Sequence, residues 1–469
     1  MLDISCPTKQ SKGSVHYLTF LCAISALGGL LFGFDTAVIS GTLTALKVQF
    51  TLNTAMEGWL VSSALLGCAA GAIVAGSLAD RFGRKLLLLL SGTLFVICSI
   101  GCTLAWNLDV LIWSRLVGGL GVGLASMVSP LYISEVSPAH LRGRMVTLFQ
   151  FAITIGICLA LISNAGLQHL ASRRILVHGT AFYQRMFVDQ VWRAMFGMEL
   201  IPALLFTGLC IVVPEAPRWL VKANRLDEAR DVLARIGGAS LAEMELQEIK
   251  STISATSTSI AQLFRHGLRK ALFVSLFLSV VSELSGITVV FYYGPDILEK
   301  SGVSLGNALG GFTAIGFVNV VFTIVAVWLM DIAGRRVLLF VGTAGAIFSL
   351  TIVGILFHSG QTKGGLIVGA LCAFVAFFAI SMGPIKWVVM SEIFPTKIRG
   401  RAMAIATLAV WVTDGIYNQF FPLLRNRLGI SGSFFMFSAV LIPQLFFVWK
   451  VMPETKGRTL EEIERSWAP

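Results

Sequence analysis

Two residues of opposite charge stand inside long apolar stretches of this sequence. Asp35 lies in the run 17–42 and Arg115 in the run 109–132. A charge isolated in a lipid-like interior is costly, so each side chain is expected to face the inside of the protein and to pair with the other. Such a pair can be a permanent ion pair that fixes helix packing. It can also be a proton switch, because Arg115 favours ionised Asp35 whereas desolvation favours the protonated form.

Two charged motifs occur twice in the chain, in the same order. Residues 80–85 read DRFGRK and residues 331–336 read DIAGRR. Further along, residues 134–145 read SEVSPAHLRGRM and residues 391–403 read SEIFPTKIRGRAM. Two landmarks repeated at nearly the same spacing predict two halves that descend from one unit. A duplicated apolar chain is typical of a secondary transporter, whose binding site lies where the halves face each other.

The repeated motifs place acids and bases where they could form a gate. We expect these charges to pair across the ends of the two halves in one conformation and to separate in another. The alternative is that basic loops only anchor one membrane face, but topology is insensitive to Asp and Glu, so their duplication favours the gate. The residues are Asp80, Arg84, Glu135 and Arg142 in the first half and Asp331, Arg335, Glu392 and Arg399 in the second.

The elements that position these charges are predicted to be transmembrane helices. Apolar residues make up 56% of the chain and charged residues 13%, too few to cover a water-soluble surface. A span needs about 20 apolar residues. We predict twelve, at about 17–42, 57–79, 86–106, 109–132, 145–167, 191–213, 271–296, 305–330, 336–358, 365–390, 402–424 and 431–451.

The chain is therefore predicted to be an all-α membrane protein with two pseudo-symmetric halves of six helices. The N-terminal half is 1–213, the C-terminal half is 271–469, and 214–270 joins them. Within this linker, 226–236 and 241–253 look like soluble amphipathic helices. Most Lys and Arg residues fall on the side that holds the linker and both termini, which predicts that this side is cytoplasmic.

Other function classes are not favoured by the sequence. The net charge of +11 is explained by basic loops at one membrane face, so no nucleic-acid partner is expected. The seven cysteines after Cys6 fall in apolar runs, which is typical of small buried residues and not of a disulfide framework. No nucleophile–base pair or metal-ligand cluster is evident, so we expect no enzyme activity, cofactor or metal site.

Several motifs together resemble the sugar porters of the major facilitator superfamily, in particular the bacterial D-xylose–proton symporters and related glucose transporters. They are GGLLFGFDTAVISG at 28–41, the 80–85 motif, Arg115 with Gly118 and Gly119, PEAPRWL at 214–220 and PETKG at 453–457. The resemblance implies alternating access around a central sugar site, with Glu215, Arg218 and Glu454 joining the gate. It also implies that Asp35 and Arg115 couple transport to a proton, because facilitative relatives lack the acid.

The same resemblance implies a set of substrate contacts. Amides would donate to and accept from hydroxyl groups, and indole rings would cover apolar C–H faces. For a single Trp, a position at the membrane interface is an alternative. The matching residues are Gln150, Gly286, Tyr292, Asn319, Gly383, Trp387 and Trp411. We also expect a helix break at Gly294-Pro295 that lets the outer end of the seventh span bend over the substrate.

This chain departs from the family pattern at the expected site. The usual Gln-Gln pair is Ser282-Glu283, the usual Asn is Thr288, and two expected amides are Ile157 and Val410. Lys386 and Asp414 stand where neutral residues are usual. Either Glu283 and Lys386 form an ion pair beside a hydroxylated ligand, or the ligand is charged, such as a sugar acid or an amino sugar. The alternative is that Lys386 and Asp414 point away from the cavity.

The sequence thus predicts proton-coupled import of a small polyhydroxylated substrate, a sugar or a sugar-like polyol. We expect a multi-pass protein of the plasma membrane, in a bacterium the inner membrane, that works as a monomer in the lipid bilayer. The alternatives are an uncoupled sugar uniporter, a porter of a charged sugar derivative and a nutrient sensor that does not transport.

Overall fold

The computed structural model describes residues 14–138, 141–173, 181–254, 268–300, 302–360, 364–394, 399–452 and 454. All regular secondary structure in these ranges is helical. The side chains of Arg142, Asp331 and Arg399, three of the expected gate residues, lie outside the described part of the chain.

The first half contains six apolar runs. The first five are α1 (Val15–Gln49), α2 (Thr54–Phe82), α3 (Arg84–Leu104), α4 (Leu108–Val136) and α5 (Arg142–Ser172). The sixth is broken into α7 (Val191–Gly197) and α8 (Leu200–Val212). The short helix α6 (Ala181–Gln184) and a π-helical turn (Arg185–Asp189) precede it. Asn53 and Asn107 cap α2 and α4, since their side chains accept from the backbone N–H groups of Met56 and Val110 at 2.8 and 2.9 Å.

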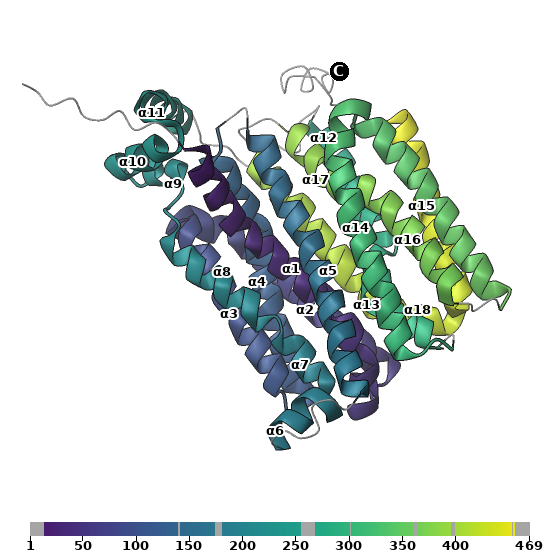
Figure 1. Ribbon diagram of the computed structural model, residues 1–469. Helices are drawn as coiled ribbons and strands as arrows, with labels where there is room; N and C mark the ends of the chain where they lie inside the picture. The colour runs from purple at the N-terminus through teal and green to yellow at the C-terminus, as the bar shows by residue number, and fades with distance from the viewer. Residues whose placement is uncertain are drawn as a thin grey trace, which may run out of the picture.

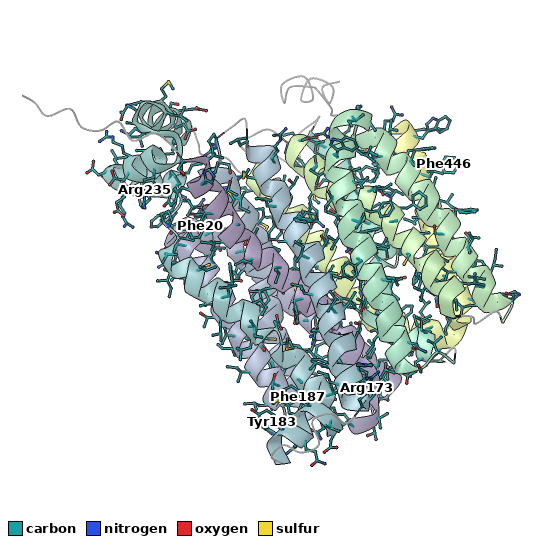
Figure 2. All side chains as sticks on the ribbon, in the orientation of Figure 1. Phe20, Arg173, Tyr183, Phe187, Arg235 and Phe446 are labelled. Atoms are coloured by element: carbon teal, nitrogen blue, oxygen red, sulfur yellow. The ribbon has the colours of Figure 1, made fainter. Side chains whose placement is uncertain are left out.

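Three short helices follow the first half and mark one end of the molecule. They are α9 (Pro217–Lys222), α10 (Leu226–Gly237) and α11 (Ala239–Ser254), close to the two soluble helices predicted there. α10 lies against the start of α1, where the Arg235 guanidinium sits 4.8 Å from the ring centre of Tyr17 (Figures 1 and 2). We call this end of the bundle the linker end and the opposite end, where α1 finishes and α6 lies, the far end.

The second half repeats the plan with two spans broken near their middles. Its helices are α12 (Leu268–Leu284), α13 (Ile287–Lys300), α14 (Leu305–Ala333), α15 (Arg335–His358), α16 (Gly364–Ile380), α17 (Met382–Glu392) and α18 (Arg399–Lys450). The breaks fall at Gly286, whose φ is 84°, and at Ser381, whose φ and ψ are −131° and −92°. Helices interrupted at mid-membrane depth are typical of transporter binding sites.

The break expected at Gly294-Pro295 is wrong. Pro295 lies inside α13, and the seventh span is interrupted at Gly286, nine residues earlier. Gly286 takes the positive φ that a side chain would oppose. Gly294 has another use, because a Cβ there would run into the ring of Phe312 on α14. The glycine therefore allows close helix packing, and the proline does not end the helix.

The number of spans agrees with the prediction once α18 is divided. Eleven helical runs in the described residues are long and apolar enough to cross a membrane. The last, Arg401–Lys450, contains two predicted spans, and Gly429 separates them with φ and ψ of 73° and 173°. Large apolar side chains cover the outer surface, among them Phe20 and Phe446 (Figure 2). The predicted all-α membrane fold is confirmed.

The two halves lie side by side and meet along three helix pairs (Figure 1). α1 packs against α13, α2 against α18 and α5 against α14. The predicted boundaries at residues 213 and 270 remain an interpretation. The cavity described below lies between these helix pairs.

Candidate functional site

Asp35 and Arg115 form an ion pair in the interior of the first half. Arg115 Nη1 lies 3.4 Å from Asp35 Oδ1, and the two residues are 1% and 3% exposed. The guanidinium also stacks 5.8 Å from the ring centre of Phe196 on the sixth run. Gly118, one turn after Arg115, leaves room for Cys98 of α3. The pairing expected from two isolated charges is present.

A second buried carboxylate, Glu199, lies beside this pair and was missed in the sequence analysis. It is 0% exposed, and one of its oxygens lies within 4.8 Å of both an Asp35 carboxylate oxygen and the Cys98 sulfur. Neither Glu199 oxygen has a hydrogen-bond partner in the described residues. The sequence gives the same indication for Glu199 as for Asp35, because both are acids inside apolar runs. Because Arg115 already supplies the positive charge here, we assign no metal to these three side chains.

A cavity of about 110 Å³ lies between the halves, with walls from both. Most of the expected substrate contacts line it, and so do Ile157 and Val410, where amides are absent. The expected lining residues are Gln150, Glu283, Thr288, Tyr292, Asn319, Gly383, Lys386, Trp387, Trp411 and Asp414. Ser282 and Gly286 are not among its lining residues: Gly286 makes the helix break, and Ser282 is buried on α12 next to Glu283.

The charged residues that depart from the family pattern face this cavity. Lys386 Nζ donates a hydrogen bond to Glu283 Oε1 and lies 5.5 Å from the ring centre of Trp387. Asp414 Oδ1 accepts a hydrogen bond of 2.7 Å from the Asn418 amide, which also donates to Thr288. An orientation away from the cavity is therefore wrong for Lys386 and Asp414.

Helix α1 connects the cavity to the buried ion pair. Phe32 and Thr36 line the cavity, and Asp35 lies between them in sequence on the side toward α4. Phe32 contacts Trp411 of the second half, with ring centres 5.1 Å apart. A movement of α1 would therefore change both the contacts of a ligand in the cavity and the contacts of Asp35.

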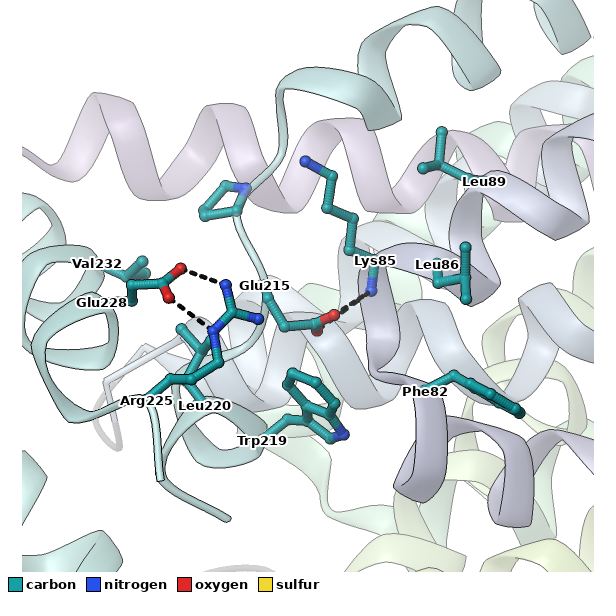
Figure 3. A pocket seen from close by; sticks show the side chains of 11 residues that line it. Phe82, Lys85, Leu86, Leu89, Glu215, Trp219, Leu220, Arg225, Glu228 and Val232 are labelled. Carbon is teal, nitrogen blue, oxygen red and sulfur yellow. Dashed lines mark hydrogen bonds and ion pairs between the residues drawn. The ribbon is translucent and has the colours of Figure 1, made fainter. Parts of the chain in front are cut away.

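At the linker end, charges form the same arrangement in each half. Glu215 accepts from the backbone N–H groups of Arg84 and Lys85 at 2.8 and 3.2 Å, which caps α3. Figure 3 shows the contact with Lys85. Arg84 Nη2 lies 2.9 Å from Glu135 and 3.5 Å from Asp80. Arg218 lies nearby on α9. All these residues belong to the first half or to the linker that follows it.

The second half repeats this arrangement. Glu454 accepts from the backbone N–H groups of Arg335 and Arg336, both at 3.0 Å, and Arg335 Nη2 lies 3.1 Å from Glu392. Both capped helices follow a glycine of positive φ, 91° at Gly83 and 86° at Gly334, and a Cβ at either would collide with the capping carboxylate. Arg84 thus pairs with Glu135, and Arg335 with Glu392, each within its own half.

At the far end, by contrast, a ring of four charges joins the halves. Lys47 of α1 lies 2.8 Å from both Glu57 of α2 and Asp296 of α13. Arg425 of α18 lies 3.3 Å from Glu57 and 3.0 Å from Asp296. We call these four residues the far-end ring. Thr44–Glu299, Thr54–Asn426 and Ser62–Gln419 add hydrogen bonds across the same seam.

Comparisons with known proteins agree with this architecture. Residues 21–467 match the family model described as sugar (and other) transporter. The arabinose-proton symporter of Bacillus subtilis is 36% identical over 467 residues, which cover 99% of this chain and 98% of that protein. The D-xylose-proton symporter of Escherichia coli K12 is 35% identical, with 97% and 96% covered.

The fold is also that of a solved relative. The structure of the xylose transporter XylE from E. coli in a partially occluded inward-open conformation gives a TM-score of 0.82 at 34% identity, covering 95% of this chain and 100% of that one. The family and these relatives are membrane transporters. The chain belongs to the sugar porter family of the major facilitator superfamily.

Proposed function

We propose that this protein imports a sugar or a sugar-like polyol together with a proton, by alternating access. The observation that carries the proposal is the buried Asp35–Arg115 pair on a helix that also lines the cavity. The arabinose and xylose symporters named above support proton coupling by their similarity. We further propose that the linker end and both termini are cytoplasmic and that one chain suffices, because both cavity walls come from one chain.

The arrangement of ion pairs supports an inward-facing conformation. The far-end ring bridges the halves, whereas the linker-end pairs Arg84–Glu135 and Arg335–Glu392 each lie within one half. With the linker end cytoplasmic, the outside is closed and the cavity is directed toward the cytoplasm. In the outward-facing conformation, the gate residues would pair across the halves and the far-end ring would come apart.

The buried charges offer a route from protonation to movement. While Asp35 is ionised, it holds the Arg115 guanidinium on α4 and thereby ties α1 to α4. When Asp35 takes up a proton, its attraction for Arg115 falls, and the neighbouring Glu199 carboxyl can then serve as the counter-charge of Arg115. Because α1 also carries Phe32 and Thr36, substrate and proton can favour the same conformation, which is the requirement for symport.

Uptake by the purified protein in proteoliposomes tests this function. The panel comprises neutral sugars, inositols, sugar acids and amino sugars, each with and without an inward proton gradient. We expect at least one polyol to accumulate inside against its gradient only while the proton gradient lasts. Equal final concentrations inside and outside under both conditions would indicate a uniporter, and binding without uptake would indicate a sensor.

A further inference from the structure

The cavity wall carries a carboxylate without a cationic partner. Three charged side chains line the cavity: Glu283, Lys386 and Asp414. Lys386 is bound to Glu283, so these two charges neutralise each other. Among the described residues no Lys, Arg or His forms an ion pair with Asp414, whose hydrogen bonds come from neutral groups, the Asn418 amide at 2.7 Å and the Thr288 hydroxyl. With all three ionised, the wall has one negative charge in excess.

A second polar group on the same helix also lacks a partner. Trp411, one turn before Asp414 on α18, lines the cavity and is 3% exposed. Its indole Nε1 has no hydrogen-bond acceptor in the described part of the protein. Buried polar groups are nearly always hydrogen-bonded, so an unsatisfied donor at a cavity wall indicates that a ligand supplies the acceptor. One turn of α18 thus offers an N–H donor for a hydroxyl oxygen and a carboxylate for a cation.

The charge pattern selects among three kinds of solute. A sugar acid would meet the excess negative charge of the wall, while Lys386, the one cation among the described lining residues, is already bound to Glu283. A neutral sugar would leave the 2%-exposed Asp414 carboxylate uncompensated when the cavity closes around it. A solute with hydroxyl groups and one protonated amine would compensate Asp414 and satisfy the indole.

We infer that the substrate is an amino sugar or another amino polyol, with its ammonium group on Asp414 and a hydroxyl oxygen on the Trp411 indole. This rests on the proposed transport function and specifies its substrate class. Asp414 is then the residue that sets specificity, and the Glu283–Lys386 pair keeps the rest of the wall neutral.

The test compares matched ligand pairs on the wild-type protein. Binding to purified protein in nanodiscs is measured by calorimetry for hexoses, for their 2-, 3- and 6-amino counterparts in protonated form, for the N-acetylated amines and for the corresponding sugar acids. At least one amino sugar is expected to bind about tenfold more tightly than both its hydroxyl parent and its N-acetyl form, a difference of about 1.4 kcal/mol. A neutral or acidic sugar that binds more tightly than every amine overturns the inference.

Two variants test whether a preference for amines depends on Asp414. Asp414→Asn keeps the acceptor for Asn418 and removes the charge, so the ratio between amine and parent should fall to about one. Asp227→Asn removes a carboxylate from α10, where the side chain is 98% exposed, and should keep the wild-type ratio. A preference that survives Asp414→Asn contradicts the inference. If Asp414→Asn does not fold, the affinities of the matched ligands for the wild-type protein still test the inference.

The same panel separates this inference from the proposed function. Proton-driven accumulation of a neutral or acidic sugar, without preference for amines, overturns the inference and leaves the transport function intact. Absence of proton-driven uptake for every compound overturns the transport function itself.

Discussion

Lys47 Nζ lies 2.8 Å from Asp296 Oδ1, and this contact joins the first helix of one half to α13 of the other. Arg425 and Glu57 complete the far-end ring, in which each base contacts both acids. All four side chains are at least four-fifths buried. The far end cannot open without separating these charges, so the ring stabilises the conformation seen here relative to one in which the far end is open.

Weakening the ring should shift the conformational equilibrium toward the outward-facing state. Arg425→Met leaves Glu57 and Asp296 with one base between them, and removing one partner of a buried ion pair costs roughly 3–5 kcal/mol. We expect the outward-open population to rise at least tenfold, because part of that cost is recovered when the acids regain water. Spin labels at Val48 and Leu428, exposed positions in the two halves near the ring, would report this as a longer interlabel distance.

Arg427→Met is the matched control for that experiment. Arg427 is exposed and lies two residues along the same helix, so its loss removes the same charge without touching the ring. Identical distance distributions for the two variants would show that the ring does not hold the far end closed.

Glu199 should be needed for the proton-loaded carrier. If Glu199 becomes the counter-charge of Arg115 when Asp35 is protonated, Glu199→Gln leaves a buried guanidinium without an anion at that step. We expect proton-driven uptake to fall roughly tenfold or more and Glu199→Asp to restore part of it. Normal uptake by the Gln variant would show that Glu199 has no part in coupling.

The two helix caps at the linker end should be equivalent. Glu215→Ala and Glu454→Ala each remove a carboxylate from the N-terminus of a helix, which costs about 1 kcal/mol. Thermal unfolding in detergent should show a similar loss for both variants. Glu228→Ala, which removes the exposed partner of Arg225 in Figure 3, is the control and should leave the unfolding temperature unchanged. A cap variant as stable as this control would contradict the capping role.

The cavity ion pair should behave as a coupled unit. Lys386→Met leaves Glu283 buried without a counter-charge and should destabilise the protein more than the double variant Lys386→Met with Glu283→Gln does. We expect a coupling energy of at least roughly 1 kcal/mol from a double-mutant cycle in unfolding free energy. Additive losses would mean that the two side chains do not interact in the folded protein.

Part of this site could be predicted because single charges in apolar runs have few possible partners. Asp35 and Arg115 were paired on that ground, and the structure places them in contact. Glu199 gave the same signal and was overlooked. The far-end ring gave no such signal: Lys47 and Glu57 stand at span ends, where charges usually contact water, and only the packing of the two halves brings Asp296 and Arg425 to them.

The position of the helix break shows a different limit. Gly294-Pro295 is the stronger local signal, yet the seventh span breaks at Gly286. A phenylalanine packs against each glycine, Phe312 at Gly294 and Phe437 at Gly286, but only Gly286 takes the positive φ of a turn. The sequence alone does not distinguish a glycine that makes a turn from a glycine that allows close helix packing. The surrounding tertiary structure determines which of the two it is.

The most direct test of proton coupling is uptake by Asp35→Asn in proteoliposomes with an inward proton gradient. The account predicts that this variant no longer accumulates the substrate above its external concentration but still exchanges it across the membrane in counterflow, because the cavity is intact. Asp109→Asn, an exposed acid at the start of α4, should accumulate it like the wild type. Accumulation by Asp35→Asn against a concentration gradient would contradict the account.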